Sequence, residues 1–413
     1  MSTYSTRAAV GARQPAPAAA MPRYLTLLFA VASAFSVANV YYAQPLLDAL
    51  AREFGISHGA VGMVIAATQV GCALALLCVV PLGDLLNRRR LTIVQLALLC
   101  AALVAVGLAG NTSFLLGGML ALGLLGTAMT QGLIAYAATM AAPSERGRVV
   151  GAAQAGVMIG LLLARAVAGL VADLAGWRAV YFAAAALALV LLAILARVLP
   201  GQAATTVKLT YAQLLASMLR MLWRDRVLQV RGVIAMLMFA TLSIFWTVLV
   251  LPLSAAPHAL SHTAIGAFGL VGVVGALAAA RAGQLADRGL GQWTSGVALA
   301  LLLAAWLPLA FTDTSLWALI VGIVVLDLAG QAIHVTNQSM IFSAHADAHS
   351  RVVACYMMFY TVGSGLGAIA TTHVYAAAGW SGVCLLGAGV SLAALVFWML
   401  TLCCMPKDGD ALM

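Results

Sequence analysis

The sequence predicts an all-α integral membrane protein with twelve transmembrane helices, arranged as two parallel repeats of six. Its composition, its apolar runs and an internal duplication support this prediction. Hydrophobic residues make up 64% of the 413 residues and charged residues only 8%, against roughly 25% charged residues in a soluble domain. A soluble chain of this length needs a polar surface that this composition does not supply. We therefore expect the chain to be solvated by a bilayer.

One offset relates separate landmarks in the two halves of the chain. Asp84 and Asp287 are 203 positions apart (287 − 84 = 203), which is close to half the chain length. The same offset pairs Arg148-Val149-Val150 with Arg351-Val352-Val353, Gly160 with Gly363, and Gly176-Trp177 with Gly379-Trp380. A single offset without gaps indicates a duplicated structural unit.

The apolar runs divide the chain in order. Residues 1–22 predict a disordered cytoplasmic tail, 23–199 the N-terminal six-helix half, 230–404 the C-terminal six-helix half, and 405–413 a second cytoplasmic tail. About 20 apolar residues span a bilayer. The twelve expected helices are 24–47, 59–82, 91–110, 113–140, 149–172, 178–199, 230–253, 263–282, 293–311, 315–340, 352–376 and 382–404.

The longest connection, residues 200–229, lies between the sixth and seventh helices. Within it, apolar residues recur at helical spacing opposite basic ones, which predicts an amphipathic segment on the membrane surface. The apolar set is Leu214, Leu215, Met218, Leu222 and Trp223, and the basic set is Arg220, Arg224 and Arg226. We expect this segment to be a cytoplasmic linker between the halves.

The basic residues predict the orientation, because Lys and Arg close to helix ends stay on the cytoplasmic side. With the N-terminus inside, eighteen of the 21 Lys and Arg residues fall in inner segments, and only Arg52 and Arg178 fall outside. Arg165 is left within the membrane. Both termini are therefore expected in the cytoplasm. Six helices separate Asp84 from Asp287, so both charged loops face the same side and the repeats are parallel.

The two charged loops are Gly83–Arg90 and Gly283–Gly291. A carboxylate beside a helix end accepts bonds from free backbone N–H groups, and a neighbouring arginine can hold a carboxylate or carbonyl. The predicted conformational latch between the halves consists of Asp84, Arg88, Asp287 and Arg288. A simple topology signal is the alternative for the basic run, but the duplicated Asp favours the latch.

Twelve helices in two parallel halves, with charged loops after the second and eighth, resemble the major facilitator superfamily. The family's loop pattern is roughly Gly-x-Leu-Ala-Asp-Arg-x-Gly-Arg-Arg. The loop from Gly283 to Gly291 is similar to it through Gly, Leu, Ala, Asp, Arg and Gly. The first loop keeps Asp84 and its basic run but has Leu85 and Asn87 where Arg and Gly are usual. The resemblance covers about residues 24–404.

Within that superfamily, the chain is similar to the branch of drug:proton antiporters. Asn39-Val40-Tyr41-Tyr42-Ala43-Gln44-Pro45 closes the first helix with the proline usual there, and Gly156-x-x-x-Gly160 resembles the start of the antiporter motif. The motif continues with Pro-x-x-Gly-Gly, whereas Leu161, Ala164 and Arg165 stand here. The arginine that the branch carries in helix four is Ala128 in this chain.

Buried polar residues predict the transport site, because an ionisable group at mid-membrane costs about 2.5–3.5 kcal/mol on insertion scales. Two formal charges are expected deep in the membrane, Arg165 and Asp327. From Asp327, a stripe continues through Gln331, His334 and Gln338 at steps of four, three and four, which places them on one helix face. We expect proton coupling at Asp327 and His334.

The expected substrate cavity combines that stripe with polar residues of other helices. Its predicted members are Arg165, Asn39, Tyr42, Gln44, Gln69, Gln131, Trp246 and Gln331. Gln131 is the half-repeat counterpart of His334. For Arg165 two partners remain open, a standing ion pair with Asp327 or an anionic group on the substrate. For each of the other residues taken singly, bonding between helices is the alternative role.

The predicted function is secondary active transport by alternating access in the bacterial inner membrane, as a monomer. Proton-coupled export of a small, partly apolar compound is the leading interpretation, and uptake or facilitated diffusion of a small organic anion or other metabolite is the alternative. A receptor that transports nothing is a further alternative. An enzyme is not expected: Ser364 and His373 lie about 13 Å apart along one helix. The seven cysteines fall in apolar runs, so neither a metal site nor a cofactor is expected.

Overall fold

The computed structural model describes residues 21–142, 145–200, 210–272, 281–282, 284–344 and 349–402. Every regular element within these ranges is helical, and ten of the described helices are long and apolar enough to cross a membrane. The last of them, α17 (His349–Thr401), breaks at Gly379 (φ 64°, ψ −160°) and so holds two of the expected spans. The tail residues 1–20 and 405–413, and residues 273–280 of the eighth expected span, lie outside the described residues.

The N-terminal half contains the elements before the linker. They are α1 (Arg23–Tyr41), η1 (Gln44–Leu46), α2 (Leu47–Phe54), α3 (Gly62–Leu74), η2 (Ala75–Val79), α4 (Leu82–Leu85), α5 (Arg88–Gly107), α6 (Thr112–Met140), α7 (Arg146–Ala175) and α8 (Trp177–Val198). The first expected span is not one straight helix. Helix α1 ends at Tyr41, because Pro45 has no N–H with which to continue an α-helix. The chain then passes through the short 3₁₀ helix η1 into α2.

The C-terminal half contains the elements after the linker. They are α10 (Arg226–Val248), α11 (Val250–Ser254), α12 (His262–Val271), η3 (Ala286–Leu290), α14 (Gly291–Ala304), α15 (Trp306–Leu309), α16 (Leu316–Ala344) and α17. Helix α10 begins at Arg226 rather than at residue 230. The reason is the side chain of Asp225, which accepts a bond from the N–H of Leu228 at 2.9 Å and caps the helix.

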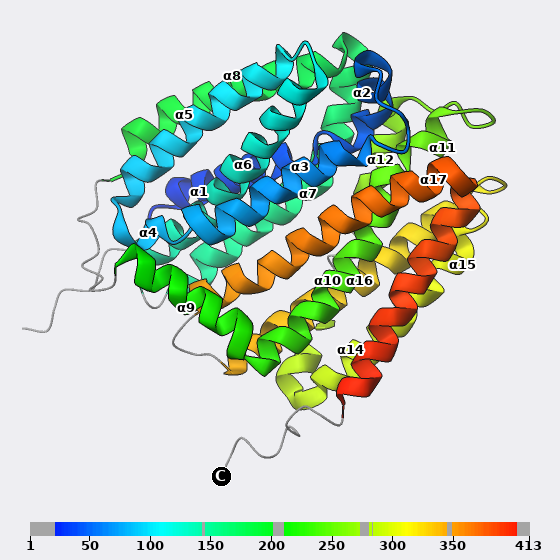
Figure 1. Ribbon diagram of the computed structural model, residues 1–413. Coiled ribbons are helices and arrows are strands. Elements are labelled where there is room, and N and C mark those ends of the chain that lie inside the picture. The colour runs from blue at the N-terminus through cyan, green and yellow to red at the C-terminus, as the bar shows by residue number, and fades with distance from the viewer. Residues whose placement is uncertain are drawn as a thin grey trace, which may run out of the picture.

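In the described part of the linker, helix α9 (Tyr211–Arg224) precedes α10 and joins the halves along one face of the molecule (Figure 1). Thr210 and Gln213 form a capping box at its start. Leu214 and Met218 are buried against the protein, whereas 82% of Trp223 is exposed. We call the face that carries α9 the linker face. The opposite face, which carries α2 and the start of α12, is the far face (Figure 1).

Glycines allow the same close packing in both halves. A Cβ built at Gly160 of α7 lies 2.2 Å from the carbonyl oxygen of Ala34 in α1, and one built at Gly363 of α17 lies 2.0 Å from that of Met236 in α10. Only glycine permits backbones to approach so closely, as in other membrane helix pairs. The two glycines matched by the 203-residue offset therefore hold equivalent helix pairs together.

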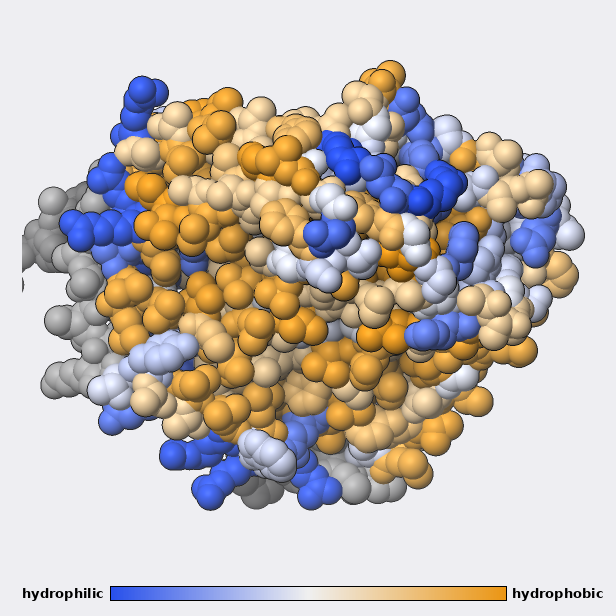
Figure 2. All heavy atoms as spheres, turned by 45° about the horizontal axis from the view of Figure 1, so that its top comes forward, coloured by the Kyte–Doolittle hydropathy of each residue, from blue (hydrophilic) through white to orange (hydrophobic). Residues whose placement is uncertain are grey.

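The surface is typical of a protein immersed in lipid. Figure 2 shows apolar residues over most of the visible middle and hydrophilic residues gathered towards the ends. Large apolar side chains are fully open to the surroundings, among them Leu174 and Trp317, each 77% exposed. Water would make this exposure unfavourable over so large an area, but a bilayer does not. The protein is therefore a multi-pass membrane protein.

Candidate functional site

A cavity of about 750 Å³ lies between the two halves. Along α7 its lining runs from Gly151 to Leu161, which corresponds to about 15 Å of helix. Gly151 lies near the start of α7 and Val353 near the start of α17, both at the linker-face ends of these helices. The cavity therefore extends from mid-membrane towards the linker face.

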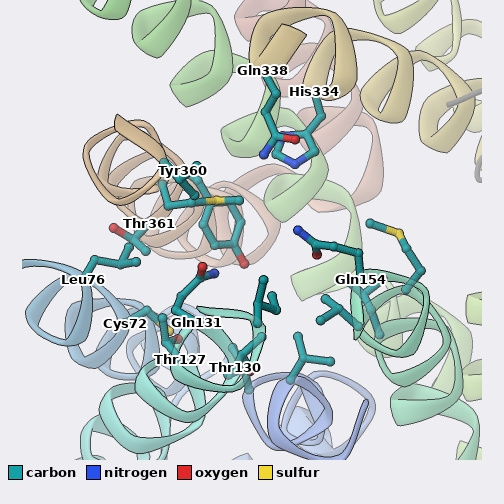
Figure 3. Close-up of a pocket in the computed structure, with 18 of the residues that line it drawn as sticks. Cys72, Leu76, Thr127, Thr130, Gln131, Gln154, His334, Gln338, Tyr360 and Thr361 are labelled. Atoms are coloured by element: carbon teal, nitrogen blue, oxygen red, sulfur yellow. The ribbon is translucent and has the colours of Figure 1, made fainter. Parts of the chain in front are cut away.

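The lining is polar without being formally charged. Gln131 and Gln154 point into the cavity from the N-terminal half, opposite His334 and Gln338 from the C-terminal half (Figure 3). The other polar lining residues are Tyr41, Cys72, Thr127, Thr130, Gln331, Tyr360 and Thr361. Apolar side chains complete the wall, and among the described lining residues there is no Asp, Glu, Lys or Arg. Such a wall offers hydrogen bonds and apolar contact but no standing ion pair.

The internal duplication extends to the cavity wall. Four pairs of lining residues are related by the 203-residue offset: Gln131 with His334, Gln154 with Met357, Val157 with Tyr360, and Met158 with Thr361. Equivalent positions of the two halves thus face each other across the same space. The paired residues differ in chemistry, so the two walls present different groups to one bound molecule.

Three of the predicted site residues line the cavity: Gln131, Gln331 and His334. The Nδ1 of His334 lies 3.1 Å from the hydroxyl of Tyr356, and its ring makes a T-shaped contact with that of Phe239, with the centroids 5.3 Å apart. The buried Oε1 of Gln331 has no hydrogen-bond partner in the described structure. His334 is thus oriented by its own half, and Gln331 retains an acceptor for a ligand.

Arg165 is absent from the cavity lining in this conformation. Its Nε donates to Oε1 of Gln44 at 2.7 Å, and only 6% of its surface is exposed. The guanidinium carbon lies 5.2 Å from the ring centroid of Tyr41 and 4.2 Å from that of Trp246. Two aromatic faces and one amide therefore stabilise the buried charge. Tyr41, which also lines the cavity, lies between that space and the arginine.

Asp327 and Arg165 form no direct ion pair in the described structure. Trp246 lies between them and contacts both. The Nε1 of Trp246 donates to Oδ1 of Asp327 at 3.3 Å, while its ring lies against the guanidinium. A Cβ built at Gly272 lies 2.5 Å from Oδ2 of Asp327, so the glycine leaves room for this carboxylate. Arg165, Gln44 and Trp246 are buried and Asp327 is half-buried; we call these four residues the charged cluster.

The remaining predicted lining residues are buried side chains of the N-terminal half, and Gln69 among them lies against α17, with its Cβ 3.5 Å from a Cβ built at Gly365. Asn39 is 3% exposed and its Nδ2 donates to the carbonyl of Phe35 in its own helix at 2.7 Å. Tyr42 is 7% and Gln69 4% exposed. None of these three is among the residues that line the cavity. Their alternative role, bonding within and between helices, fits this placement better.

The count of buried charges from the sequence was incomplete. Arg231 of α10 is only 1% exposed, and its Nη1 donates to Oγ of Ser295 at 3.0 Å. The sequence pattern assigned it to a linker-face segment because it lies near a helix end. Packing of α10 against α14 and α16 covers it, which a hydropathy pattern does not reveal.

The two halves meet tightly at the far face. The Oγ1 of Thr372 in α17 donates to the carbonyl of Gly59 at 3.0 Å, and a Cβ built at Gly62 lies 2.3 Å from the carbonyl oxygen of Ala368. Nearer the cavity, the hydroxyls of Tyr41 and Tyr360 lie 2.7 Å apart. These contacts close the far-face end of the cavity.

The proposed latch residues are only partly described. Arg88 donates to Oδ1 of Asp84 at 2.9 Å, and both belong to the N-terminal half. The neighbouring Arg89 donates to the carbonyl of Ala196 at 2.6 Å, again in the same half. Arg288 is exposed, and the side chain of Asp287 lies outside the described residues. In this conformation the described loop contacts organise one half, so a bridge between the halves remains a prediction.

Replacing Asp84 by asparagine is expected to slow transport about tenfold, equivalent to about 1.4 kcal/mol in the balance between conformations. The variant should insert and fold, because a partly exposed ion pair such as Asp84–Arg88 contributes only about 0–1 kcal/mol. Initial transport rates at equal membrane expression test this. Glu145→Gln, which removes another linker-face carboxylate, is the control and should stay near the wild-type rate. An unchanged rate in Asp84→Asn would remove the latch from the mechanism.

Sequence reasoning missed much of the cavity wall. Gln154, Tyr360 and Thr361 line it, yet they were not among the predicted site residues. The 203-residue offset carried a usable signal, because it pairs Tyr360 with Val157 and Thr361 with Met158, all within one helical turn of Gly160 or Gly363. Gly160 and Gly363 lie on the helix faces that pack on α1 and α10, so residues beside those faces point towards the centre of the helix bundle.

Comparison with known proteins agrees with this architecture. The sequence profile of the Major Facilitator Superfamily matches residues 29–351 and 282–410. The chain is 42% identical over 381 residues to the putative uncharacterized transporter YgaY of Escherichia coli K12, across 91% of this chain and 94% of that protein. It is 32% identical over 377 residues to the probable transporter SCO4007 of Streptomyces coelicolor, across 89% and 85%. The fold is similar to that of a bacterial homologue of the human lysosomal transporter Spinster, crystallised inward-facing and unoccupied, with a TM-score of 0.74, 15% identity, and 91% and 94% coverage.

Proposed function

This chain belongs to the Major Facilitator Superfamily of secondary transporters, and from that premise we propose that it exports a small, uncharged, partly apolar compound in exchange for protons. The family places it among transporters and not among enzymes. The observation that carries the finer proposal is the chemistry of the cavity wall. Amides, hydroxyls and one imidazole alternate there with apolar side chains, without a formal charge among the described lining residues.

The substrate class follows from what this wall can satisfy. Burying a charged ligand without a counter-charge is unfavourable, whereas a neutral molecule loses little on entering an apolar space with a few hydrogen-bonding groups. The amides of Gln131, Gln154 and Gln338 both donate and accept, so they suit carbonyl, hydroxyl or amine groups. About 750 Å³ suits a drug-sized molecule.

The anion alternative relied on Arg165. In this conformation its guanidinium is held by Gln44 and lies between Tyr41 and Trp246. An anion would have to displace these contacts in order to reach it. We therefore favour a neutral substrate and assign Arg165 to the charged cluster.

The orientation is part of the proposal. The linker face carries most of the basic loop residues, including Arg88–Arg90 and Arg146–Arg148, and basic segments remain in the cytoplasm. With the linker face inside, both termini are cytoplasmic and the cavity is accessible from the cytoplasm. Such a state accepts a compound from inside, and rocking of the two halves then exposes it to the other side of a bacterial cytoplasmic membrane.

Proton coupling is assigned to Asp327. It belongs to the charged cluster at the closed end of the cavity and shares α16 with the lining residues Gln331 and His334. By helical rise, His334 lies about 10 Å from Asp327 on the same helix face. A proton could thus pass along α16 between the cavity and the carboxylate, through groups that also sense the substrate.

A transport screen in inverted vesicles, with and without a proton gradient, tests the function. Neutral and anionic compounds of matched size should be compared, and only neutral ones should accumulate in a gradient-dependent way. Accumulation of anions alone would contradict the proposal.

For the compound that the screen identifies, Gln154→Leu should raise the apparent KM about fivefold to thirtyfold, since a lost hydrogen bond costs about 1–2 kcal/mol. Expression and maximal rate should change little, because the side chain points into the cavity (Figure 3). Gln213→Leu is the matched control for KM: it removes the capping bond of α9, far from the cavity lining, and should leave KM unchanged. Equal KM values in both variants would show that Gln154 does not contact the substrate.

A further inference from the structure

A histidine bridges two carboxylates where the halves meet at the far face. His262 is the first residue of α12 in the C-terminal half. Its Nε2 lies 3.0 Å from Oδ1 of Asp48, and its Nδ1 lies 2.8 Å from Oδ1 of Asp173. Asp48 belongs to α2 and Asp173 to the last turn of α7. One ring of the C-terminal half thus joins two acidic residues of the N-terminal half.

The arrangement is satisfied only by a protonated ring. An ionised carboxylate accepts hydrogen bonds and donates none, so each ring nitrogen must donate, and only imidazolium has two N–H groups. A neutral ring would point one lone pair at a carboxylate oxygen. The ring is 21% exposed, Asp48 4% and Asp173 25%. The site is therefore largely sheltered but accessible to protons from water.

We propose that Asp48, His262 and Asp173 form a second proton-binding site, which holds the far face closed while occupied and lets it open when the proton leaves. This site is separate from Asp327. His262 begins α12, whereas Asp327 packs against Gly272 beyond its last residue, about 15 Å along the helix. The inference needs only that the halves separate at the far face, whatever the substrate.

The two carboxylates have different tasks. Asp173 also accepts bonds from the backbone N–H of His262 at 3.2 Å, and from the N–H and hydroxyl of Thr263 at 2.7 Å and 2.6 Å. These bonds do not need the proton of the ring, and the helix N-terminus favours the negative charge of Asp173 there. They break only when the far face opens and α7 separates from α12. Asp48 makes its bond to the C-terminal half through the ring alone among the described contacts. The Asp48–His262 bond is the one that depends on the proton.

Helices α7 and α12 are in direct backbone contact beside His262. A Cβ built at Gly169 of α7 lies 2.1 Å from the carbonyl oxygen of His262. Because α7 and α12 touch through their backbones here, His262 cannot leave both carboxylates without separating the two halves. Breaking the bridge and opening the far face are therefore the same movement.

The charged groups described around this site do not take over the bond that His262 makes to Asp48. On α2, Arg52 pairs with the other oxygen of Asp48 at 2.9 Å, and Glu53 pairs with Arg178 of α8. His258 lies on the loop before α12. Arg165 of α7 and Asp327 of α16 pack near the opposite end of α12, beside Gly269 and Gly272. Since Arg52 belongs to the same half as Asp48, its ion pair persists whether the far face is open or closed.

The sign of the pH effect follows from linkage. The closed far face binds one proton that the open far face holds less tightly, so acid on that side favours closure. With the far face outward, closure would follow proton binding from outside. The proton is released to the same side on opening, so this site biases the cycle without carrying the transported proton.

Distance measurements on the full chain in lipid nanodiscs test the proposal without any substrate. Spin labels are introduced as unnatural amino acids at Ser57, between α2 and α3, and at Ala256, between α11 and α12, so that the native cysteines stay in place. From about pH 8.5 to about pH 5, which brackets the ordinary histidine pKa of about 6.5, the short-distance population should grow. The ratio of short to long distances should rise by up to about tenfold per pH unit.

Three variants determine the outcome. His262→Gln should lose the pH response and favour the long distance, whereas His262→Arg, which always carries its charge and donors, should keep the short distance at every pH. His258→Gln is the matched control and should respond as the wild type does. A wild-type distance independent of pH, or an unaltered pH response in His262→Gln, would overturn the proposal.

Discussion

Replacing Asp327 by asparagine is expected to abolish gradient-driven accumulation, so that the ratio of substrate inside to outside the vesicles falls to about one. Asparagine keeps the size of the side chain, and its oxygen can still accept the bond from Nε1 of Trp246, which is 3.3 Å from Oδ1 in the wild type. It cannot take up or release a proton. Exchange of labelled for unlabelled substrate should persist, because that process needs movement of the halves but no coupled proton.

The measurement compares uphill accumulation with exchange in the same inverted vesicles. Asp313→Asn, which changes an exposed acidic residue between α15 and α16, is the matched control and should behave as wild type. If Asp327→Asn still drives uphill transport, the coupling site lies elsewhere. Loss of exchange together with accumulation would instead assign Asp327 to the movement of the halves.

Replacing Arg165 by alanine should have the second large effect, a loss of transport of at least about tenfold together with a lower unfolding temperature. A hydrogen bond to a charged group contributes about 1.5–3 kcal/mol, and each desolvated cation–π contact up to about 2 kcal/mol. The substitution removes the bond to Gln44 and the contacts with Tyr41 and Trp246. It also removes the one positive charge of the charged cluster, which offsets the negative charge of Asp327.

A set of variants separates the roles of Arg165. If it mainly offsets the charge of Asp327, the double variant Arg165→Ala with Asp327→Ala should recover the unfolding temperature that Arg165→Ala loses. If it binds substrate, the double variant should fold but fail to bind. Arg165→Lys keeps the charge but loses the planar group that stacks between two rings and donates from Nε, so it should recover only part of the stability. Wild-type substrate affinity in Arg165→Ala would end the substrate role.

The composition alone determined that this chain folds in a bilayer. With 8% charged residues, no arrangement covers the protein with polar groups, and in lipid the backbone must satisfy its own hydrogen bonds. Uninterrupted apolar runs of about 20 residues do so as helices. The internal duplication could also be recognised from the 203-residue offset, because both halves need the same kind of residue at equivalent packing positions. Gly160 and Gly363 were matched in the sequence, and the structure shows them packing on α1 and α10 in the same way.

The sequence identified polar residues in the membrane but not their neighbours, because hydropathy and spacing do not determine how a helix is rotated within the bundle. Gln131 and His334 line the cavity as expected. Arg165 was expected to face substrate or pair directly with Asp327, yet the ring of Trp246 lies between the two charges. Gln44, in the short helix η1 that follows α1, accepts the bond from Nε of Arg165.

Only the tertiary structure brought together Asp48, Asp173 and His262. Asp173 and His262 are 89 positions apart, and Asp48 and His262 are 214 apart. Each lies near a helix end, where a polar residue is ordinary and carries no periodic signal. Their chemistry arises because the two halves close on each other at the far face and place a ring that can hold a proton between two carboxylates. The sequence thus determined the solvent, the helices and the repeat, whereas packing across the interface between the halves decided which charges meet.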